Sequence, residues 1–410
     1  MPTTTASTTL PLPFSVDRHP LPPDVEDFRD RVRDYVNEYV RPSVARNDQA
    51  PADAFDWDVV RAGHDLGLLR MVIPREFGGM GYGIFAVAVA LEEIAAACAG
   101  TALIFGATLL GQAPVLLSAD PQLQARFLPQ FCGDDPVLAC NAITEDLAGC
   151  DLLIPENARY ATDVLTARPE GDYYVLDGRK RFITNAKLAS FGCVYANLAD
   201  AVGATGLTAF LVPLDLPGIS RGPVADKMGY RACLGSELIF EGVRVPAENI
   251  VFGPGQGMLV NVQQMNMARA SVAAISTGVA RGAFELAREW GGERVQGGVE
   301  LYRHQFTARK LAEMSSKIDA SRLMYRWAAQ LADTEMPAPV YEPAAAKLFA
   351  DRIAIEVAQE AMSLIGARGY LREYAIEKFV RDSFGARIYE GTPEVLALAI
   401  TESLYSEDEF

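Results

Sequence analysis

Histidine and paired cysteines are the scarcest features of this 410-residue sequence. It has three histidines, and none of its six cysteines forms a C-x-x-C pair. The residues needed for a zinc site, a disulfide framework or a histidine proton relay are therefore too few, and we expect no metal. Half of the residues are apolar and 22% are charged, with 34 glycines and 24 prolines. This composition excludes the disordered, collagenous and coiled-coil classes and indicates a globular protein.

Positive charge is also in short supply. The chain has 37 Lys and Arg against 53 Asp and Glu, and its formal charge of -16 repels nucleic acid and anionic membranes. The uncharged run at residues 94–119 is long enough for a bilayer, but glycines and Pro114 interrupt it, so we predict buried helices there. The first seventeen residues hold no Lys or Arg, which argues against a secretory or transit signal. We therefore predict a flexible tail, no membrane or nucleic-acid partner and a cytoplasmic protein.

Helical periodicity dominates the first third of the chain. Apolar residues recur at threes and fours in residues 25–40, and helical patterns follow at 54–69, 85–97 and 122–131. Near Pro136 short apolar runs replace that spacing and predict strands at 137–144, 173–176, 182–184, 193–198, 207–213 and 237–245. The pair Asp177-Gly178 lies between two of these runs and predicts a hairpin turn.

After the glycine-rich stretch at 253–257 the helical period returns in four long segments, at 258–290, 303–331, 343–365 and 370–388. Long helices with short connections predict a four-helix bundle. The glycines lack the βαβ context of a dinucleotide fingerprint, so we interpret them as a connection. The sequence predicts an α+β protein with a tail at 1–20, an N-terminal helical domain at 21–135, a β-barrel-like domain at 136–252 and a four-helix-bundle domain at 253–410.

The most informative segment is Tyr389-Glu390-Gly391-Thr392-Pro393-Glu394. Thr392 resembles a helix N-cap, with Pro393 at the first helical position and Glu394 in the first turn. Glu390 then lies in the loop just before a helix. The helix N-terminus lowers its pKa and burial raises it, and a carboxylate under such opposed influences can act as a general base. A solvated loop glutamate is the alternative interpretation.

Two further segments carry polar groups at the ends of predicted strands. In residues 141–151 a strand that ends near Thr144 gives way to a loop, whose backbone groups could bind a planar polar ring. In residues 182–185, Phe182 and Thr184 lie two residues apart and so share one face of a strand. Each segment alone is weak evidence, because Thr and Phe are ordinary at strand ends.

In order and spacing the three segments together resemble the flavin- and substrate-contacting motifs of the acyl-CoA dehydrogenase family. The resemblance covers residues 25–398 and includes the helix, β, helix organisation. Further matching segments are Lys227-Met228-Gly229, residues 240–246, and Arg381-Asp382. The resemblance implies an enzyme that uses FAD to introduce an α,β double bond into an acyl thioester.

Roles follow from the matching positions. Glu390 resembles the base that removes the α-proton, while the β-hydrogen leaves as hydride to flavin N5. Relatives that carry the base on the helix that opens the bundle have it at the position of Ala268, which cannot do acid-base work, beside Arg269. Thr144, Phe182, Thr184 and Thr392 resemble cofactor-binding residues, and Cys150, Tyr389 and Gly391 resemble substrate-binding ones.

Arg294 and Gln305 match a pair that reaches the flavin nucleotide of a neighbouring subunit, and arginine suits phosphate because its planar fork binds two oxygens. A solvated arginine at a helix end is the alternative. The resemblance therefore implies a homodimer or homotetramer. It also implies an electron-transfer flavoprotein as the electron acceptor.

Several positions depart from the family pattern around the cofactor and the thioester. They are Asp146 for proline, Cys150 for serine, Gly297 for an aromatic residue, Ser363 for glutamine and Ala367 for glycine. The thioester carrier is therefore left open between coenzyme A and an acyl carrier protein. An acidic carrier would need a basic landing patch, and the candidates are Arg372, Lys378, Arg381 and Arg387, although a charged helix is usually just solvated.

Two other functions compete with the dehydrogenase. A flavin monooxygenase of the same superfamily typically lacks the base at this position, so Glu390 argues against it. A catalytically silent homologue that has lost FAD and acts as a binding protein is the second alternative. A bound flavin that bleaches with an acyl thioester would separate the dehydrogenase from both.

Overall fold

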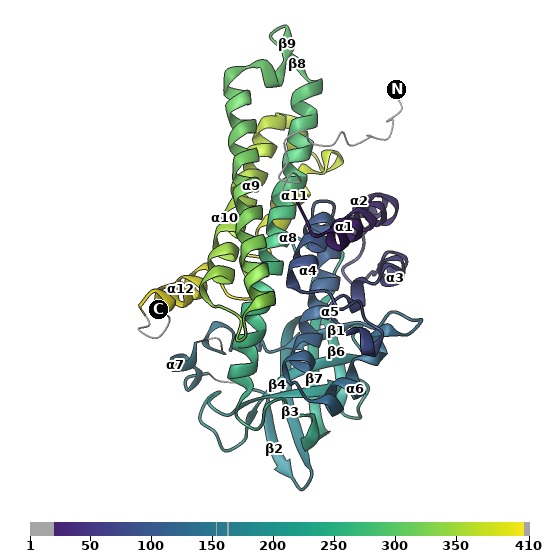
Figure 1. Ribbon diagram of the computed structural model, residues 1–410, viewed down its shortest axis with the longest axis vertical. Coiled ribbons are helices and arrows are strands. Elements are labelled where there is room, and N and C mark those ends of the chain that lie inside the picture. The colour runs from purple at the N-terminus through teal and green to yellow at the C-terminus, as the bar shows by residue number, and fades with distance from the viewer. Residues whose placement is uncertain (1–19, 153, 162–163, 406–410) are drawn as a thin grey trace.

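The computed structural model describes residues 20–152, 154–161 and 164–405 (Figure 1). Nearly all of the predicted tail at 1–20 lies outside these residues. Within them, a long helical bundle stands above a curled sheet, and the N-terminal helices lie along one side of both (Figure 1). This arrangement confirms the predicted α+β fold with an N-terminal helical part, a β part and a helical bundle.

The N-terminal part consists of six α-helices in the order α1 Pro23–Tyr35, α2 Arg41–Gln49, α3 Trp57–Leu66, α4 Ile84–Ala95, α5 Ala99–Leu117 and α6 Pro121–Phe127. A π-helical turn, Val36–Val40, joins α1 to α2. By length and composition α5 could cross a membrane, but 72% of its apolar window is buried inside the protein. Its first half, with Ile104, Phe105 and Leu109, belongs to the hydrophobic core that the N-terminal helices share with the bundle, while Val115 belongs to a second core cluster under the sheet.

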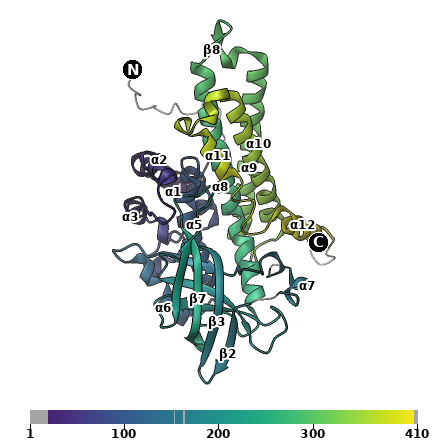
Figure 2. The same ribbon diagram turned by 180° about the vertical axis from the view of Figure 1, so that it is seen from behind.

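The sheet carries the predicted β part. Its strands are β1 Ala139–Ala142, β2 Thr166–Glu170, β3 Tyr173–Thr184, β4 Phe191–Leu198, β5 Leu207–Pro213, β6 Ile219–Val224 and β7 Gly235–Pro246. They follow the order β1-β4-β2-β3-β7-β6, and β5 pairs with β4. Figure 2 shows the face on which β7, β3 and β2 lie side by side. A short helix, α7 Pro155–Ala158, lies in the connection from β1 to β2.

The hairpin predicted at Asp177-Gly178 is wrong, because β3 runs through both residues. Gly178 serves a close approach instead: a Cβ there would lie 2.9 Å from the Leu165 Cα. The register with β7 shifts at this point, and the Asp177 carboxylate accepts a hydrogen bond from the Gly242 N–H at 2.7 Å. The chain turns earlier, between β2 and β3, where Gly171 has φ 63°. An Asp-Gly pair therefore marked a β-bulge here and not a turn.

The bundle consists of α8 Gly257–Glu293, α9 Gln305–Thr334, α10 Tyr341–Ile365, α11 Ile376–Ser383 and α12 Pro393–Tyr405. A small hairpin of β8 Val295–Gln296 and β9 Val299–Glu300 joins α8 to α9 at the tip (Figure 1). The fourth predicted helix, at 370–388, is shorter than expected. Ala375 has φ 57° just before α11, so the helix cannot extend backwards through it.

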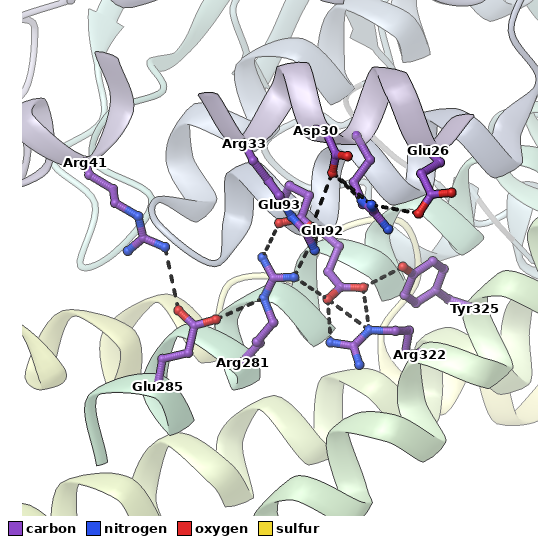
Figure 3. A network of polar contacts seen from close by, with 11 residues as sticks. Glu26, Asp30, Arg33, Arg41, Glu92, Glu93, Arg281, Glu285, Arg322 and Tyr325 are labelled. Atoms are coloured by element: carbon purple, nitrogen blue, oxygen red, sulfur yellow. Dashed lines mark hydrogen bonds and ion pairs between the residues drawn. The ribbon is translucent and has the colours of Figure 1, made fainter. Parts of the chain in front are cut away.

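A buried charged network joins the N-terminal helices to the bundle (Figure 3). The Glu92 carboxylate of α4 accepts hydrogen bonds from Arg322 at 2.8 Å and from Arg281 at 3.1 Å. The neighbouring Glu93 accepts from Arg281 at 2.7 Å and from Arg33 at 2.9 Å. Because α8 carries Arg281 and α9 carries Arg322, the network fixes α4 against both bundle helices.

Candidate active site

The loop between α11 and α12 presents Glu390 in a constrained conformation. Glu390 has φ 54° and Gly391 has φ 99°, so two consecutive residues are left-handed. A non-glycine residue there costs roughly 1–2 kcal/mol, which the surrounding contacts must offset. Helix α12 begins at Pro393 as predicted, and its Leu396 N–H donates to the Thr392 carbonyl at 2.9 Å.

The Glu390 carboxyl is buried and incompletely bonded. Its Oε2 atom has no solvent access and no hydrogen-bond partner among the described residues. Burial raises the pKa of Glu390 to about 7, against the opposing charges of Lys347 and Arg269 and with a contribution from Asp351. A carboxyl that titrates near neutrality can both accept and release a proton at physiological pH.

Arg269 of α8 lies beside the loop that carries Glu390. A Cβ at Gly391 would lie 3.7 Å from its Nη2 atom, and its Nη1 donates to the Asn266 side chain at 3.1 Å. Burial lowers the pKa of Arg269, and the nearby Glu390 opposes that shift. The guanidinium thus supplies positive charge beside the carboxyl, while the preceding Ala268 supplies no titratable group.

Tyr389 lies beside Glu390 and packs against a segment of the β part. Its ring meets the ring of Tyr230 edge to face, with centroids 6.1 Å apart. Gly385 must lack a side chain, because a Cβ there would lie 2.2 Å from the Tyr230 ring. The Tyr230 N–H donates to Asp382 of α11 at 2.7 Å. The β part is therefore docked directly on the loop that carries Glu390.

The predicted cofactor residues of the β part lie together where β1 ends and β3 bulges. The Arg181 N–H donates to the Thr144 carbonyl at 2.9 Å, and the register of β3 shifts between Lys180 and Ile183. Phe182, inside this bulge, has φ 59° and is 62% exposed. Thr184, at the end of β3, pairs with Gly235.

One short segment contacts both groups of residues. Tyr230, against Tyr389, and Gly235, against Thr184, lie five residues apart in the sequence, and such a segment spans at most about 17 Å. The segment 230–235 therefore connects the Thr184 end of β3 to the loop that carries Glu390.

A buried ion pair that the sequence did not single out supports the bulge. The Lys180 ammonium pairs with the Glu145 carboxylate and donates to the Ile143 carbonyl at 2.8 Å. The same carboxylate accepts from the Leu165 N–H at 2.8 Å. Burial lowers the pKa of Lys180, and Glu145 opposes the shift. Lys180 lies between Arg179 and Arg181 in the sequence, and a run of three basic residues gives no sign that the middle side chain is fully buried.

The remaining predicted residues are more exposed. Cys150 lies at the surface at the start of a 3-10 turn, and Asp146 forms an ion pair with Arg181, whose guanidinium also stacks on the Phe182 ring. The backbone N–H of Glu394, and after it the Thr392 side chain, lower the pKa of the Glu394 carboxyl. Among the described residues no group of three or more His, Cys, Asp or Glu side chains could hold a metal ion.

Arg294 and Gln305 are not brought to Glu390 within one chain. They are exposed residues at the tip of the bundle, where α8 ends and α9 begins. At 1.5 Å per residue, Arg294 lies about 37 Å along α8 from Arg269. Nearby, Gly297 has φ 62° and Gly298 has φ 86°, as a tight two-residue turn between β8 and β9 requires.

Comparison with known proteins identifies the family to which this fold belongs. Three family descriptions match consecutive parts of the chain: "Acyl-CoA dehydrogenase, N-terminal domain" at residues 22–135, "middle domain" at 140–243 and "C-terminal domain" at 255–405. The chain belongs to the acyl-CoA dehydrogenase family.

Individual relatives agree with this assignment. Cyclohex-1-ene-1-carbonyl-CoA dehydrogenase of Geobacter metallireducens is 35% identical over 83% of this chain and 87% of its own length. The structure of butyryl-CoA dehydrogenase from Megasphaera elsdenii superposes with a TM-score of 0.88 at 30% identity and covers 94% of this chain and 99% of the other. The prolyl acyl carrier protein oxidase AnaB superposes with a TM-score of 0.86 at 25% identity, over 94% of this chain and 100% of the other.

This acyl-CoA dehydrogenase is an oxidoreductase that acts on CH-CH bonds and uses FAD. Its own residues fit that cofactor. The exposed ring of Phe182 offers an aromatic face, and the half-buried Thr144 and Thr184 offer hydroxyls beside it. Orphaned buried oxygens at Asn141 in β1 and at Glu390 mark places where further hydrogen-bonding groups belong.

Proposed function

We propose that Glu390 is the base that removes the α-proton during FAD-dependent α,β-dehydrogenation of an acyl thioester. The observation that carries the proposal is the buried Glu390 carboxyl, whose Oε2 meets no hydrogen-bond partner in the described part of the chain and whose pKa is raised to about 7. An unpartnered oxygen is free to accept a proton from carbon, and a pKa near neutrality leaves a useful fraction ionised.

Different residues have different proposed roles in this proton transfer. An α-C–H is a very weak acid unless fixed donors meet the developing enolate oxygen in a dry site, and the Glu390 backbone N–H is the donor that the resemblance assigns. When bound, FAD would supply the oxidising chemistry that removes the β-hydrogen. Thr144, Phe182 and Thr184 would hold its ring system, while Tyr389, Gly391 and Cys150 would contact the thioester.

We also propose that the active enzyme is a homodimer or homotetramer. Arg294, at the end of α8, lies about 37 Å along that helix from the Arg269 that neighbours Glu390, and Gln305 begins α9 at the same tip of the bundle. The two residues therefore suit a cofactor other than the one beside Glu390 of their own chain. An arginine there suits a phosphate of FAD bound to a second copy. Arg294→Ala should therefore weaken FAD retention, measured as the flavin-to-protein absorbance ratio after gel filtration.

Coenzyme A is the thioester carrier that the surface favours. Of the four cations considered as a landing patch for an acidic carrier protein, Lys378 is buried against Asp382 and Arg381 is paired with Asp48 and Glu377. Arg372 and Arg387 alone remain exposed. The similarity to a prolyl acyl carrier protein oxidase supports the alternative. An electron-transfer flavoprotein is the proposed acceptor, as in the family.

Anaerobic flavin bleaching tests this function. The purified protein should be yellow, and a panel of acyl-CoA thioesters, each matched by the same acyl group on an acyl carrier protein, should include one that bleaches the flavin. A colourless protein that cannot be reconstituted with FAD would point to the silent homologue. A yellow protein that no thioester bleaches, but that consumes oxygen once its flavin is reduced and hydroxylates a substrate, would point to the monooxygenase.

A further inference from the structure

Lys347 of α10 is a buried cation in contact with the loop that carries Glu390. Its side chain has no solvent exposure. The ammonium donates to Asp351 Oδ2 at 2.8 Å, to the Ala386 carbonyl at 2.8 Å and to the Gly391 carbonyl at 3.0 Å. An ammonium has three N–H donors, so these contacts use its full capacity.

The two carbonyls bracket Glu390 in the sequence. They belong to residues 386 and 391, so Lys347 closes the loop from both ends. Within it, Glu390 and Gly391 hold their left-handed φ values of 54° and 99°. Such a conformation of a non-glycine residue persists only where its surroundings determine it from several sides. Lys347 is one of those determinants.

Asp351 fixes Lys347 in turn. Its Oδ2 accepts from Lys347, one helical turn earlier on α10, and its Oδ1 accepts from the Ser276 hydroxyl of α8 at 2.7 Å. Both carboxylate oxygens are therefore bonded, and the pair is tied to the same helix that carries Arg269. A fully bonded buried pair is rigid, and removal of one partner would leave the other charge uncompensated.

We propose that the Lys347–Asp351 pair is a positioning device for Glu390, which holds the loop in its left-handed bend and balances two opposite charges against the carboxyl. The proposal rests on the proposed function, in which Glu390 is the base. Neither residue touches the reacting atoms, so both are positioning residues and not catalytic ones.

The charges act in opposite directions on Glu390. Burial raises the pKa of Glu390, Lys347 is the strongest influence that lowers it, and Asp351 adds to the rise. The other titratable groups that face the site are Arg269 of α8, which also lowers the pKa, and Tyr389 and Tyr230, whose own pKa values burial holds well above their usual range. The two tyrosines are therefore neutral near pH 7.

Two single substitutions test the device by the sign of their effects. Lys347→Met leaves Asp351 facing Glu390 and should move the Glu390 titration upward by about one pH unit. Asp351→Asn can still accept from Lys347 through its amide oxygen and can donate from its amide nitrogen to the Ser276 hydroxyl oxygen. It loses the negative charge, so it should move the titration downward by a similar amount. A purely structural role would lower stability in both variants without such opposite shifts.

The titration is read in two independent ways. The infrared carbonyl stretch of protonated Glu390, identified by its loss in Glu390→Gln, reports the carboxyl without turnover. The pH dependence of anaerobic flavin reduction reports the same group in the loaded enzyme. Lys378→Met is the matched control, because Lys378 forms a similar buried pair with Asp382 at four residues' spacing in α11. It should lower stability and leave the Glu390 titration in place.

Shifts of the same sign, or no shift in either variant, would overturn the proposal. If Lys347→Met does not fold, the downward shift in Asp351→Asn decides it alone, and its absence refutes the device. Failure of the proposed function would look different. In that case the parent enzyme would not bleach with any thioester, while the infrared titration of Glu390 would still move in the two expected directions.

Discussion

The carboxyl groups of Glu92 and Glu390 are both buried, yet the pKa of the first is held below its usual range and that of the second is raised to about 7. Burial alone would raise the pKa of either carboxyl. At Glu92, the positive charges of Arg322 and Arg281 outweigh the effect of burial on the pKa. Both arginines also donate hydrogen bonds to the carboxylate, and the Tyr325 hydroxyl donates to Oε2 at 2.5 Å (Figure 3). At Glu390 no such donor reaches Oε2 among the described residues.

The difference lies in where the nearby cations direct their donors. Lys347 and Arg269 both lie close enough to affect the pKa of Glu390. Lys347, however, donates its three N–H groups to Asp351 and to two backbone carbonyls. Arg269 directs Nη1 to Asn266. A carboxylate that accepts hydrogen bonds from neighbouring cations has a structural role. A carboxylate that those cations influence only electrostatically keeps an oxygen with which it can exchange a proton.

The largest expected effect comes from Glu390→Gln. The variant should keep its fold and its FAD, because the side chain changes little in size and gives up no hydrogen bond at Oε2. Flavin reduction by an acyl thioester should slow by about 10²-fold or more, the range for loss of a general base. Stopped-flow absorbance under anaerobic conditions measures it. Reduction at the parent rate would show that Glu390 is not the base.

Glu92→Gln should lower stability and leave the rate of flavin reduction nearly unchanged, the reverse of what we expect for Glu390→Gln. Removal of this charge leaves Arg322 and Arg281 buried without their shared counter-ion, so unfolding should become easier by about 3–5 kcal/mol. Urea unfolding followed by circular dichroism measures the loss. The rate of flavin reduction per bound FAD should stay near that of the parent, and a large drop in that rate would mean that the two sites are coupled.

The pH dependence of stability should also separate the two residues. Glu390 binds its proton more tightly in the folded protein, so it makes stability fall as pH rises between its usual value of 4.5 and about 7. Glu92 binds its proton less tightly, so its contribution is lost as pH falls below 4.5. Thermal unfolding across this range tests both signs. Glu390→Gln should remove the decline toward pH 7, and an unchanged decline would contradict the assignment.

The smallest effect should come from Tyr325→Phe. It removes one hydrogen bond to Glu92 and leaves both arginines in place, so the expected cost is about 1.5–3 kcal/mol, the range for a bond to a charged group. Chemical denaturation measures it beside Glu92→Gln. A loss as large as that of Glu92→Gln would mean that the hydroxyl, and not the arginines, dominates the network.

The structure confirms some of the sequence predictions and shows that one of them is wrong. The Glu390 segment was visible because its signals are local: Thr392 and Pro393 predict a helix start, and the helix begins there. The error at Asp177-Gly178 arose because the pair suits a turn or a bulge equally well, and only the approach of Leu165 decides between them. The roles of Thr144, Phe182, Arg294 and the other assigned residues stay predictions.

Lys347, Asp351 and Lys180 carried no usable signal in the sequence. A lysine in a helical or strand pattern is normally solvated, and nothing in its neighbours announces that it is buried. Lys347 meets Ala386 and Gly391 some forty residues later in the chain, and Lys180 meets Glu145 thirty-five residues earlier. Such contacts depend on how α10 and β3 are packed and not on local pattern.

The sequence by itself determined the order of helical and β regions and the presence of a glutamate before the last helix, because periodicity and capping act over a few neighbouring residues. Only the tertiary structure decided which carboxylates are bonded by cations and which are merely near them. Burial and charge at Glu390 come from α8, α10 and its own loop, and the pKa of a carboxyl depends on that combined surrounding.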